Sequence, residues 1–92
     1  MKDKKLKVWN GGGIYSGPYR NYGVNVAAHS QKEAVDMLNN LIGGHYTISY
    51  FRDFFSNCWG NHMDGIVPSE PCVYLCDKIK GKPFLVTKKL KQ

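Results

Sequence analysis

The feature that most constrains this 92-residue sequence is a helix that its own residues delimit at both ends. Ser30 and Glu33 have the spacing of a capping box, in which a hydroxyl and a carboxylate each satisfy an otherwise unpaired backbone N–H group. Gly43 and Gly44 supply the left-handed stop of a helix. Between these signals, apolar residues recur at three- and four-residue steps: Ala34, Val35, Leu38, Leu41 and Ile42. The pattern predicts an amphipathic helix over residues 31–42.

A second helix is predicted over residues 48–57, with Thr47 as its N-terminal cap. Four apolar residues share one of its faces: Ile48, Phe51, Phe54 and Phe55. Because side chains at this spacing lie on one side of a helix, we expect that face to enter the core.

Four segments are predicted to be strands, at residues 5–9, 22–28, 72–76 and 83–88. In the second segment, Val24, Val26 and Ala28 alternate with other residues and share one face. Gly81 lies in the turn between the last two strands. We therefore expect an α+β fold of order ββααββ, a single domain over residues 1–92. Its antiparallel sheet should carry both helices on one face.

The charge of the chain favours anionic partners. There are 13 Lys and Arg against 7 Asp and Glu, for a net charge of +6 at pH 7. Lysines gather toward both ends of the chain: Lys2, Lys4, Lys5, Lys7, Lys78, Lys80, Lys82, Lys88, Lys89 and Lys91. They form one basic edge if the first and last strands are neighbours; otherwise they keep edge strands soluble and unpaired.

The length and the cysteine content of the chain predict its oligomeric state and its cellular compartment. A domain this short buries little more than ~60% of its unfolded surface, so we expect a homo-oligomer. The 3 cysteines are odd in number, and the N-terminal segment has no apolar stretch like that of a signal peptide. No apolar run approaches the ~20 residues of a membrane span. We expect a soluble cytoplasmic protein with reduced thiols and no membrane partner.

Catalytic and metal sites are not expected. Cys58 and His62 could form a nucleophilic pair, but the sequence indicates no third residue that would orient the histidine. The carboxylates are scattered, so no general acid and base pair is indicated. We therefore predict that the protein is not an enzyme. Cys58, His62, Cys72 and Cys76 have ligand-like spacings. However, an extended segment from Cys72 to Cys76 separates those residues by ~13 Å, too far to share one ion. We expect no metal and no cofactor.

The glycine-rich segment before the second strand carries the candidate binding site. Its backbone N–H groups could hold an anion, its aromatic rings could stack on a base, and its arginine could pair with phosphate. The candidate ligand-binding residues are Trp9, Gly11, Gly12, Gly13, Tyr15, Tyr19, Arg20 and Tyr22. Lys5 and Lys7 would steer an anion toward them. The alternative is a hairpin loop whose tyrosines fold back on the core.

The two predicted helices also allow a DNA-binding interpretation. Residues 30–40 and 47–57 loosely resemble a helix-turn-helix, in which Ser49, Tyr50 and Arg52 would face the groove. The connection over residues 41–46 is longer than the usual three or four residues, and phenylalanines dominate the second helix. A helix pair that covers a sheet is the competing interpretation.

The runs KLKVWNGG, VAAHSQKEAVDMLNN and ISYFRDFFS resemble a class of small uncharacterised phage and prophage accessory proteins. This chain departs from that pattern in its longer glycine–tyrosine and helix–helix loops. The resemblance implies a phage-type, non-enzymatic anti-defence protein in the host bacterial cytosol. Such a protein would sequester an anionic, nucleotide-like immune signalling molecule, or alternatively inhibit a host defence protein directly.

Overall fold

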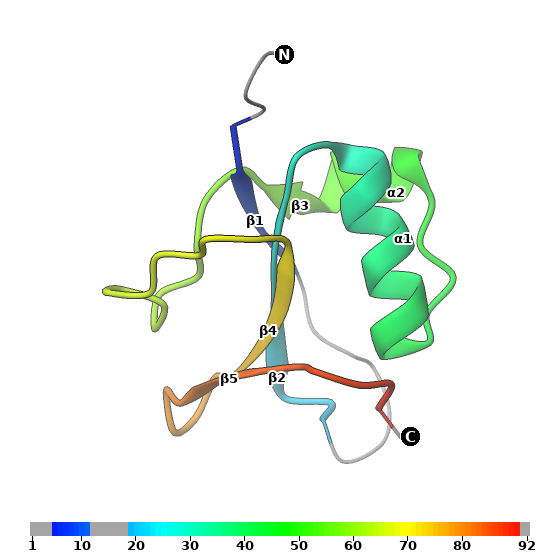
Figure 1. Cartoon of the computed structure of the whole chain (residues 1–92). Coiled ribbons are helices and arrows are strands. Elements are labelled where there is room, and N and C mark those ends of the chain that lie inside the picture. Colours follow the sequence, from blue (N-terminus) through cyan, green and yellow to red (C-terminus); the bar gives the residue numbers. More distant parts are fainter. Residues whose placement is uncertain (1–4, 12–18, 91–92) are drawn as a thin grey trace.

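The structure is a computed structural model that describes residues 5–11 and 19–90 (Figure 1). Its elements, in chain order, are β1 (Lys7–Gly11), β2 (Tyr22–Ala28), α1 (Gln31–Ile42), α2 (Ile48–Phe54), β3 (Phe55–Ser56), β4 (Cys72–Asp77) and β5 (Pro83–Leu85). The α+β class is confirmed. The order is ββααββ with one additional short strand, β3.

The five strands form one antiparallel sheet in the order β3-β1-β2-β4-β5. Across β1 and β2 the register aligns Trp9 with Val26 and Asn10 with Asn25. Because successive side chains of a strand point to opposite faces, the first pair lies on one face of the sheet and the second pair on the other.

This strand order separates the two groups of lysines. β2 and β4 lie between β1 and β5, so the first and last strands are not neighbours and the condition for one basic edge is not met. Lys7 of β1 and Lys82, just before β5, therefore lie on opposite sides of the central strands. The described lysines do not form one continuous basic edge.

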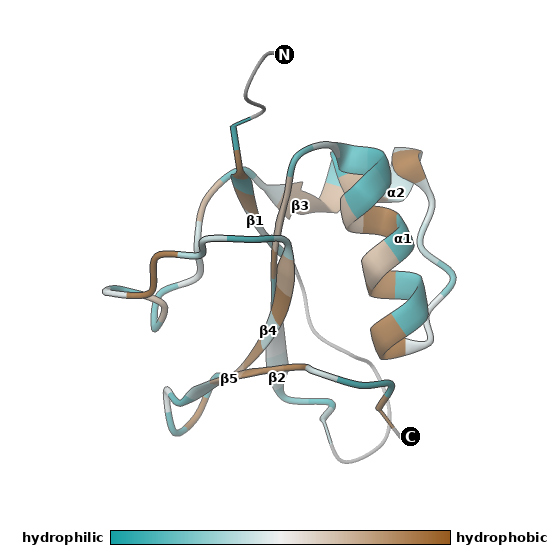
Figure 2. Cartoon of the chain, viewed as in Figure 1, coloured by the Kyte–Doolittle hydropathy of each residue, from teal (hydrophilic) through white to brown (hydrophobic). Residues whose placement is uncertain are grey.

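Helix α1 has the predicted bounds, Gln31–Ile42. The Ser30 hydroxyl accepts a hydrogen bond from the Glu33 N–H at 3.1 Å, and Gly43 ends the helix in the left-handed conformation with φ 78°. The Glu33 carboxylate accepts the His29 N–H at 2.6 Å, one residue before the position expected for a capping box. Hydrophobic and hydrophilic segments alternate along α1 in Figure 2, as its amphipathic pattern requires.

Helix α2 is shorter than predicted, because the chain becomes extended at Phe55 (φ −109°, ψ 136°) and pairs with Gly11 of β1. The two residues approach closely. A Cβ atom added at Gly11 would lie 2.5 Å from the Phe55 ring, so the packing leaves no room for a side chain there. The Phe55 ring stacks on Phe51 with centroids 4.6 Å apart. Strand pairing thus ends α2 three residues before its expected boundary.

The main core lies between the sheet and the two helices, which cover one face as predicted (Figure 1). Its buried members are Trp9, Val24, Val26, Ala28, Ala34, Val35, Leu38, Ile42, Phe51, Phe55, Val73, Leu75 and Val86. The core thus draws on the three long strands, the short strand β3, both helices and the segment that follows β5.

The opposite face of the sheet is covered by the irregular connection over residues 57–71 (Figure 1). The Trp59 ring meets Tyr74 of β4 edge-on with centroids 6.1 Å apart, and Met63 is fully buried. The Asn57 side-chain amide donates to the Val8 carbonyl at 2.8 Å, which ties the connection to β1. Both faces of the central strands are therefore covered, one by helices and one by this connection.

Candidate functional site

A pair of asparagines lies beneath this connection, on the sheet face that the helices do not cover. Asn10 of β1 and Asn25 of β2 are register partners. Asn25 has no exposed surface and is the one polar side chain among the fully buried residues described. The Asn10 Nδ2 group donates to the Asn25 Oδ1 atom at 2.9 Å and to the Val24 carbonyl at 3.3 Å. Two polar side chains thus lie side by side on neighbouring strands of the sheet.

The surrounding hydrogen bonds fix the orientation of the Asn25 amide. Its Oδ1 atom accepts the Gly60 backbone N–H at 2.9 Å in addition to the Asn10 Nδ2 group. Because a backbone N–H can only donate, Oδ1 must face Gly60, and Nδ2 must point the other way. The Asn25 Nδ2 group is buried and has no hydrogen-bond partner in the described part of the chain. An unpaired donor of this kind costs about 1–3 kcal/mol and calls for a structural or functional explanation.

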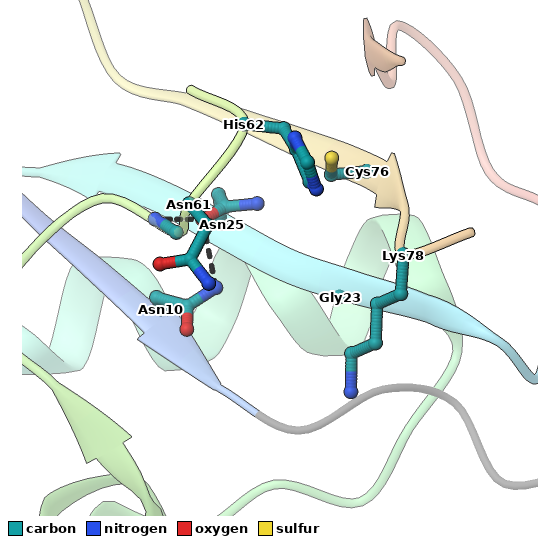
Figure 3. A pocket seen from close by; sticks show the side chains of 8 residues that line it. Asn10, Gly23, Asn25, Asn61, His62, Cys76 and Lys78 are labelled. Atoms are coloured by element: carbon teal, nitrogen blue, oxygen red, sulfur yellow. Dashed lines mark hydrogen bonds between the residues drawn. The ribbon is translucent and has the colours of Figure 1, made fainter. Parts of the chain in front are cut away.

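A cavity of about 270 Å³ adjoins this amide. It is lined by Asn10, Gly23, Asn25, Gly60, Asn61, His62, Cys76 and Lys78. Figure 3 shows the Asn25 amide nitrogen on the side of the amide that faces His62 and Cys76. The inner wall comes from the buried residues of β2 and β4, whereas Asn61, His62 and Lys78 at the rim are exposed. The cavity therefore has a buried end and an exposed end.

The exposed end is cationic. The Lys78 side chain extends beside Gly23, since a Cβ atom added there would lie 3.5 Å from the Lys78 Cε atom. The His62 ring lies against Gly81 of the β4–β5 turn, whose φ of +70° and lack of a side chain allow this approach. That turn is largely hydrophilic in Figure 2 and also carries Lys80 and Lys82. No carboxylate is among the described residues that line the cavity.

Cys76 places a protonated thiol in the inner wall. Burial, and secondly the charge of Asp77, raise the pKa of the Cys76 thiol above its ordinary value. The Sγ atom lies 3.8 Å from the Asp77 carbonyl oxygen, to which it can donate weakly. The thiol therefore stays neutral at physiological pH and is not an activated nucleophile.

Two of the predicted ligand residues belong to the core instead. Trp9 is only 6% exposed and packs edge-on against Phe51 with centroids 5.2 Å apart. Its ring has no open face on which a base could stack. Gly11 is buried against the Phe55 ring. Its lack of a side chain is explained by this packing.

Tyr19, Arg20 and Tyr22 do lie close together at the start of β2. The two tyrosine rings meet edge-on at 5.2 Å, and both contact Phe84 of β5, at 6.1 and 5.8 Å. Both tyrosines are half-buried and Arg20 is exposed. This grouping agrees with the alternative in which the tyrosines fold back on the protein. The assignment of these residues to a ligand stays a prediction.

The predicted site and the cavity lie on different faces of the sheet. Tyr22 shares the helix-covered face with Val24 and Val26, while Gly23 and Asn25 face the cavity. Gly12, Gly13 and Tyr15 lie outside the described residues.

Sequence reasoning missed the cavity residues. Asn10, Asn25 and Lys78 are separated in sequence, and no motif joins them. The one available signal was Asn25 itself, a polar residue between Val24 and Val26 in a strand that is apolar at most positions.

Within residues 5–11 and 19–90, no three His, Cys, Asp or Glu side chains gather as metal ligands would. None of the described helices is long and apolar enough to cross a membrane. Helix α2 has only seven residues, and its Phe51 is buried beneath α1 and the sheet. The DNA-binding interpretation stays a prediction.

No protein-family model, curated protein or solved structure matches this chain.

Proposed function

We propose that the protein is a non-enzymatic binding protein that holds a small, anionic, nucleotide-like molecule in the cavity between the sheet and residues 57–71. The observation that carries this proposal is the Asn25 Nδ2 group, a buried hydrogen-bond donor without a partner that adjoins the cavity. That nitrogen has almost no accessible surface, so a ligand reaches it only when the cavity wall moves. A ligand that then supplies an acceptor would remove the cost of leaving the donor unpaired.

Size and charge narrow the class of ligand. A cavity of about 270 Å³ is slightly smaller than the ~300–1,000 Å³ typical of ligand sites, so it suits a single metabolite rather than a peptide. Lys78 at the rim, with no carboxylate in the described lining, favours negative charge. Asn10, Asn61 and the backbone add uncharged polar groups, which orient a ligand through hydrogen bonds.

The neutral Cys76 thiol supports binding without turnover. A Cys–His pair in a cavity resembles a nucleophilic dyad, but such a dyad requires a lowered thiol pKa. Here burial raises the pKa of Cys76, which keeps it a small, weakly polar wall residue. The ligand would be sequestered and released unchanged.

The biological role follows from the resemblance to phage accessory proteins. A cytosolic protein of this kind would lower the free concentration of a nucleotide immune signal in an infected host. A protein that acts by stoichiometric capture needs affinity and abundance but no catalytic group, which is consistent with the proposed site.

The proposal is tested by calorimetric titration with a nucleotide panel: cyclic AMP, cyclic GMP, GMP and UMP. The blocking variant is Gly23→Val, which places a β-branched side chain, favourable in a strand, inside the cavity. The control is Ile79→Ala, at a residue that is 79% exposed and does not line the cavity. We expect at least one panel member to bind the wild type and the control, and at least tenfold weaker binding to the blocking variant.

The earlier candidate site is tested with Tyr19→Ala and Arg20→Ala. If these variants lose binding while Gly23→Val keeps it, the ligand sits at the tyrosine cluster and the cavity assignment is wrong. If no panel member binds, the nucleotide proposal fails. Native mass spectrometry of protein purified from cells with active nucleotide signalling gives both the retained small mass and the expected homo-oligomer.

A further inference from the structure

The geometry points to one orientation of the bound molecule: its base enters the cavity as far as Asn25, and its phosphate stays at the rim beside Lys78. This inference rests on the proposed function, since it concerns the same cavity and the same class of ligand. It is carried by the contrast between the two ends of the cavity, one buried and neutral, the other exposed and cationic.

The buried end suits an uncharged group. Asn25 is fully enclosed, and the thiol of Cys76 beside it stays protonated. A phosphate placed there would lose its hydration and meet one neutral amide donor, whereas buried anions require several donors or a cation. The carbonyl oxygen or ring nitrogen of a base needs only one donor, and the Asn25 Nδ2 group supplies it once movement of the cavity wall uncovers this buried nitrogen.

The donor at that end cannot reverse. An asparagine amide can usually flip and offer its oxygen instead, but the Gly60 N–H and the Asn10 Nδ2 group both donate to the Asn25 Oδ1 atom at 2.9 Å. If the Asn25 amide flipped, its NH₂ group would face the Gly60 N–H and the Asn10 Nδ2 group, which are also donors. Both hydrogen bonds to Asn25 would then be lost. The site therefore selects a ligand atom that accepts a hydrogen bond.

The exposed end suits the phosphate. The Lys78 ammonium group is a compact charge on a flexible stem, which binds phosphate without the fixed geometry that arginine imposes. Lys78 begins the turn that also carries Lys80 and Lys82, so a phosphate there would lie in a positive potential. Because Lys78 is exposed, its contribution to affinity is modest, and we expect a loss of about 2- to 5-fold when it is removed.

The orientation is tested by titrating the protein with UMP, uridine, GMP, guanosine and inorganic phosphate. If the base enters first, at least one nucleoside binds within about tenfold of its monophosphate, because the inner contacts are the same. Phosphate at millimolar concentration then displaces neither nucleoside. Lys78→Met weakens the monophosphate about 2- to 5-fold and leaves the nucleoside unchanged.

The Gly23→Val variant weakens nucleoside and nucleotide together, and circular dichroism confirms that it is folded. The inference is overturned if a monophosphate binds, its nucleoside does not, and inorganic phosphate competes, because the phosphate would then occupy the inner end. That result leaves the proposed function standing. If the monophosphates, nucleosides and phosphate all fail to bind and the cyclic nucleotides fail as well, the proposed function itself is wrong.

Discussion

Two glycine substitutions in the wall of the cavity should have opposite effects on stability. Both Gly23 and Gly60 line the cavity, and neither has a positive φ, so alanine is compatible with the backbone at each position. They differ in what a new methyl group would meet. At Gly23 the nearest atom is the Lys78 Cε atom at 3.5 Å, an ordinary contact. At Gly60 the Asn10 Nδ2 atom would lie at 2.7 Å and the Asn25 Oδ1 atom at 3.0 Å.

The Gly60→Ala methyl group cannot be accommodated by a simple side-chain movement. Asn10 is held by its bonds to Asn25 and to the Val24 carbonyl, so displacing it breaks at least one of them. Overpacking costs about 1–3 kcal/mol, and a lost hydrogen bond adds about 1 kcal/mol. We expect Gly60→Ala to destabilise the protein by about 2–4 kcal/mol. For a domain of this size the melting temperature falls by roughly 10–25 °C.

Gly23→Ala is the matched control, because it is the same chemical change in the same wall. Alanine loses less backbone entropy than glycine in a strand, so we expect a gain of about 0.5–1 kcal/mol. The assay is thermal and urea unfolding of both variants, followed by circular dichroism. If Gly60→Ala is within about 0.5 kcal/mol of wild type, the hydrogen-bonded unit of Asn10, Asn25 and Gly60 is not held as described, and the fixed Asn25 donor loses its basis.

Three further predictions concern the helix cap and the thiols. Ser30→Ala should cost about 1 kcal/mol in urea unfolding, because the Glu33 N–H loses its acceptor; an unchanged midpoint would show that the cap is dispensable. Exposed Cys58 should react with iodoacetamide well before buried Cys76, as measured by peptide mass spectrometry, and equal rates would contradict the enclosed inner wall. Raised thiol pKa values at Cys72 and Cys76 mean that the folded state binds these protons more tightly than the unfolded state. The free energy of unfolding should therefore be highest below the ordinary thiol pKa and fall as pH rises above it, and it should fall less in Cys76→Ala. Urea unfolding at several alkaline pH values measures this, and a free energy that does not change with pH would contradict the prediction.

Elements with local signals were predictable from the sequence. Helix α1 has its cap, its apolar period and its terminating glycine within one segment, and its bounds were predicted correctly. Strand β2 was also placed correctly, because alternation is a local pattern. The end of α2 was not, because the conformation of Phe55 is set by pairing with Gly11, a residue distant in sequence. The pairing with Gly11 overrides the helix propensity of the sequence at Phe55.

The face assignments show a similar limit. Trp9 of β1 enters the main core, whereas Leu6 and Val8 are half-buried. Both faces of β1 are covered, so alternation could not decide which side the helices occupy. The expectation that Trp9 offers a stacking surface failed for this reason.

The cavity was beyond the reach of sequence patterns. Its inner wall is on the face of β2 opposite Val24, Val26 and Ala28, and the segment that buries it has no regular period. Trp59 and Met63 in that segment are large apolar residues, and they anchor it to the sheet. The cluster of Asn10, Asn25 and Lys78 forms only when three strands and one connection are assembled.

The most direct test of the account is an N–H correlation spectrum of isotope-labelled protein, titrated with each member of the nucleotide panel. The reporter is the side-chain amide of Asn25, assigned by its loss in an Asn25→Asp variant. We predict that the ligand shifts the Asn25 side-chain signals together with the backbone signals of Gly23 and Gly60. If a bound nucleotide shifts Tyr19 and Arg20 but leaves Asn25 unchanged, the cavity is not the binding site and the central claim is refuted.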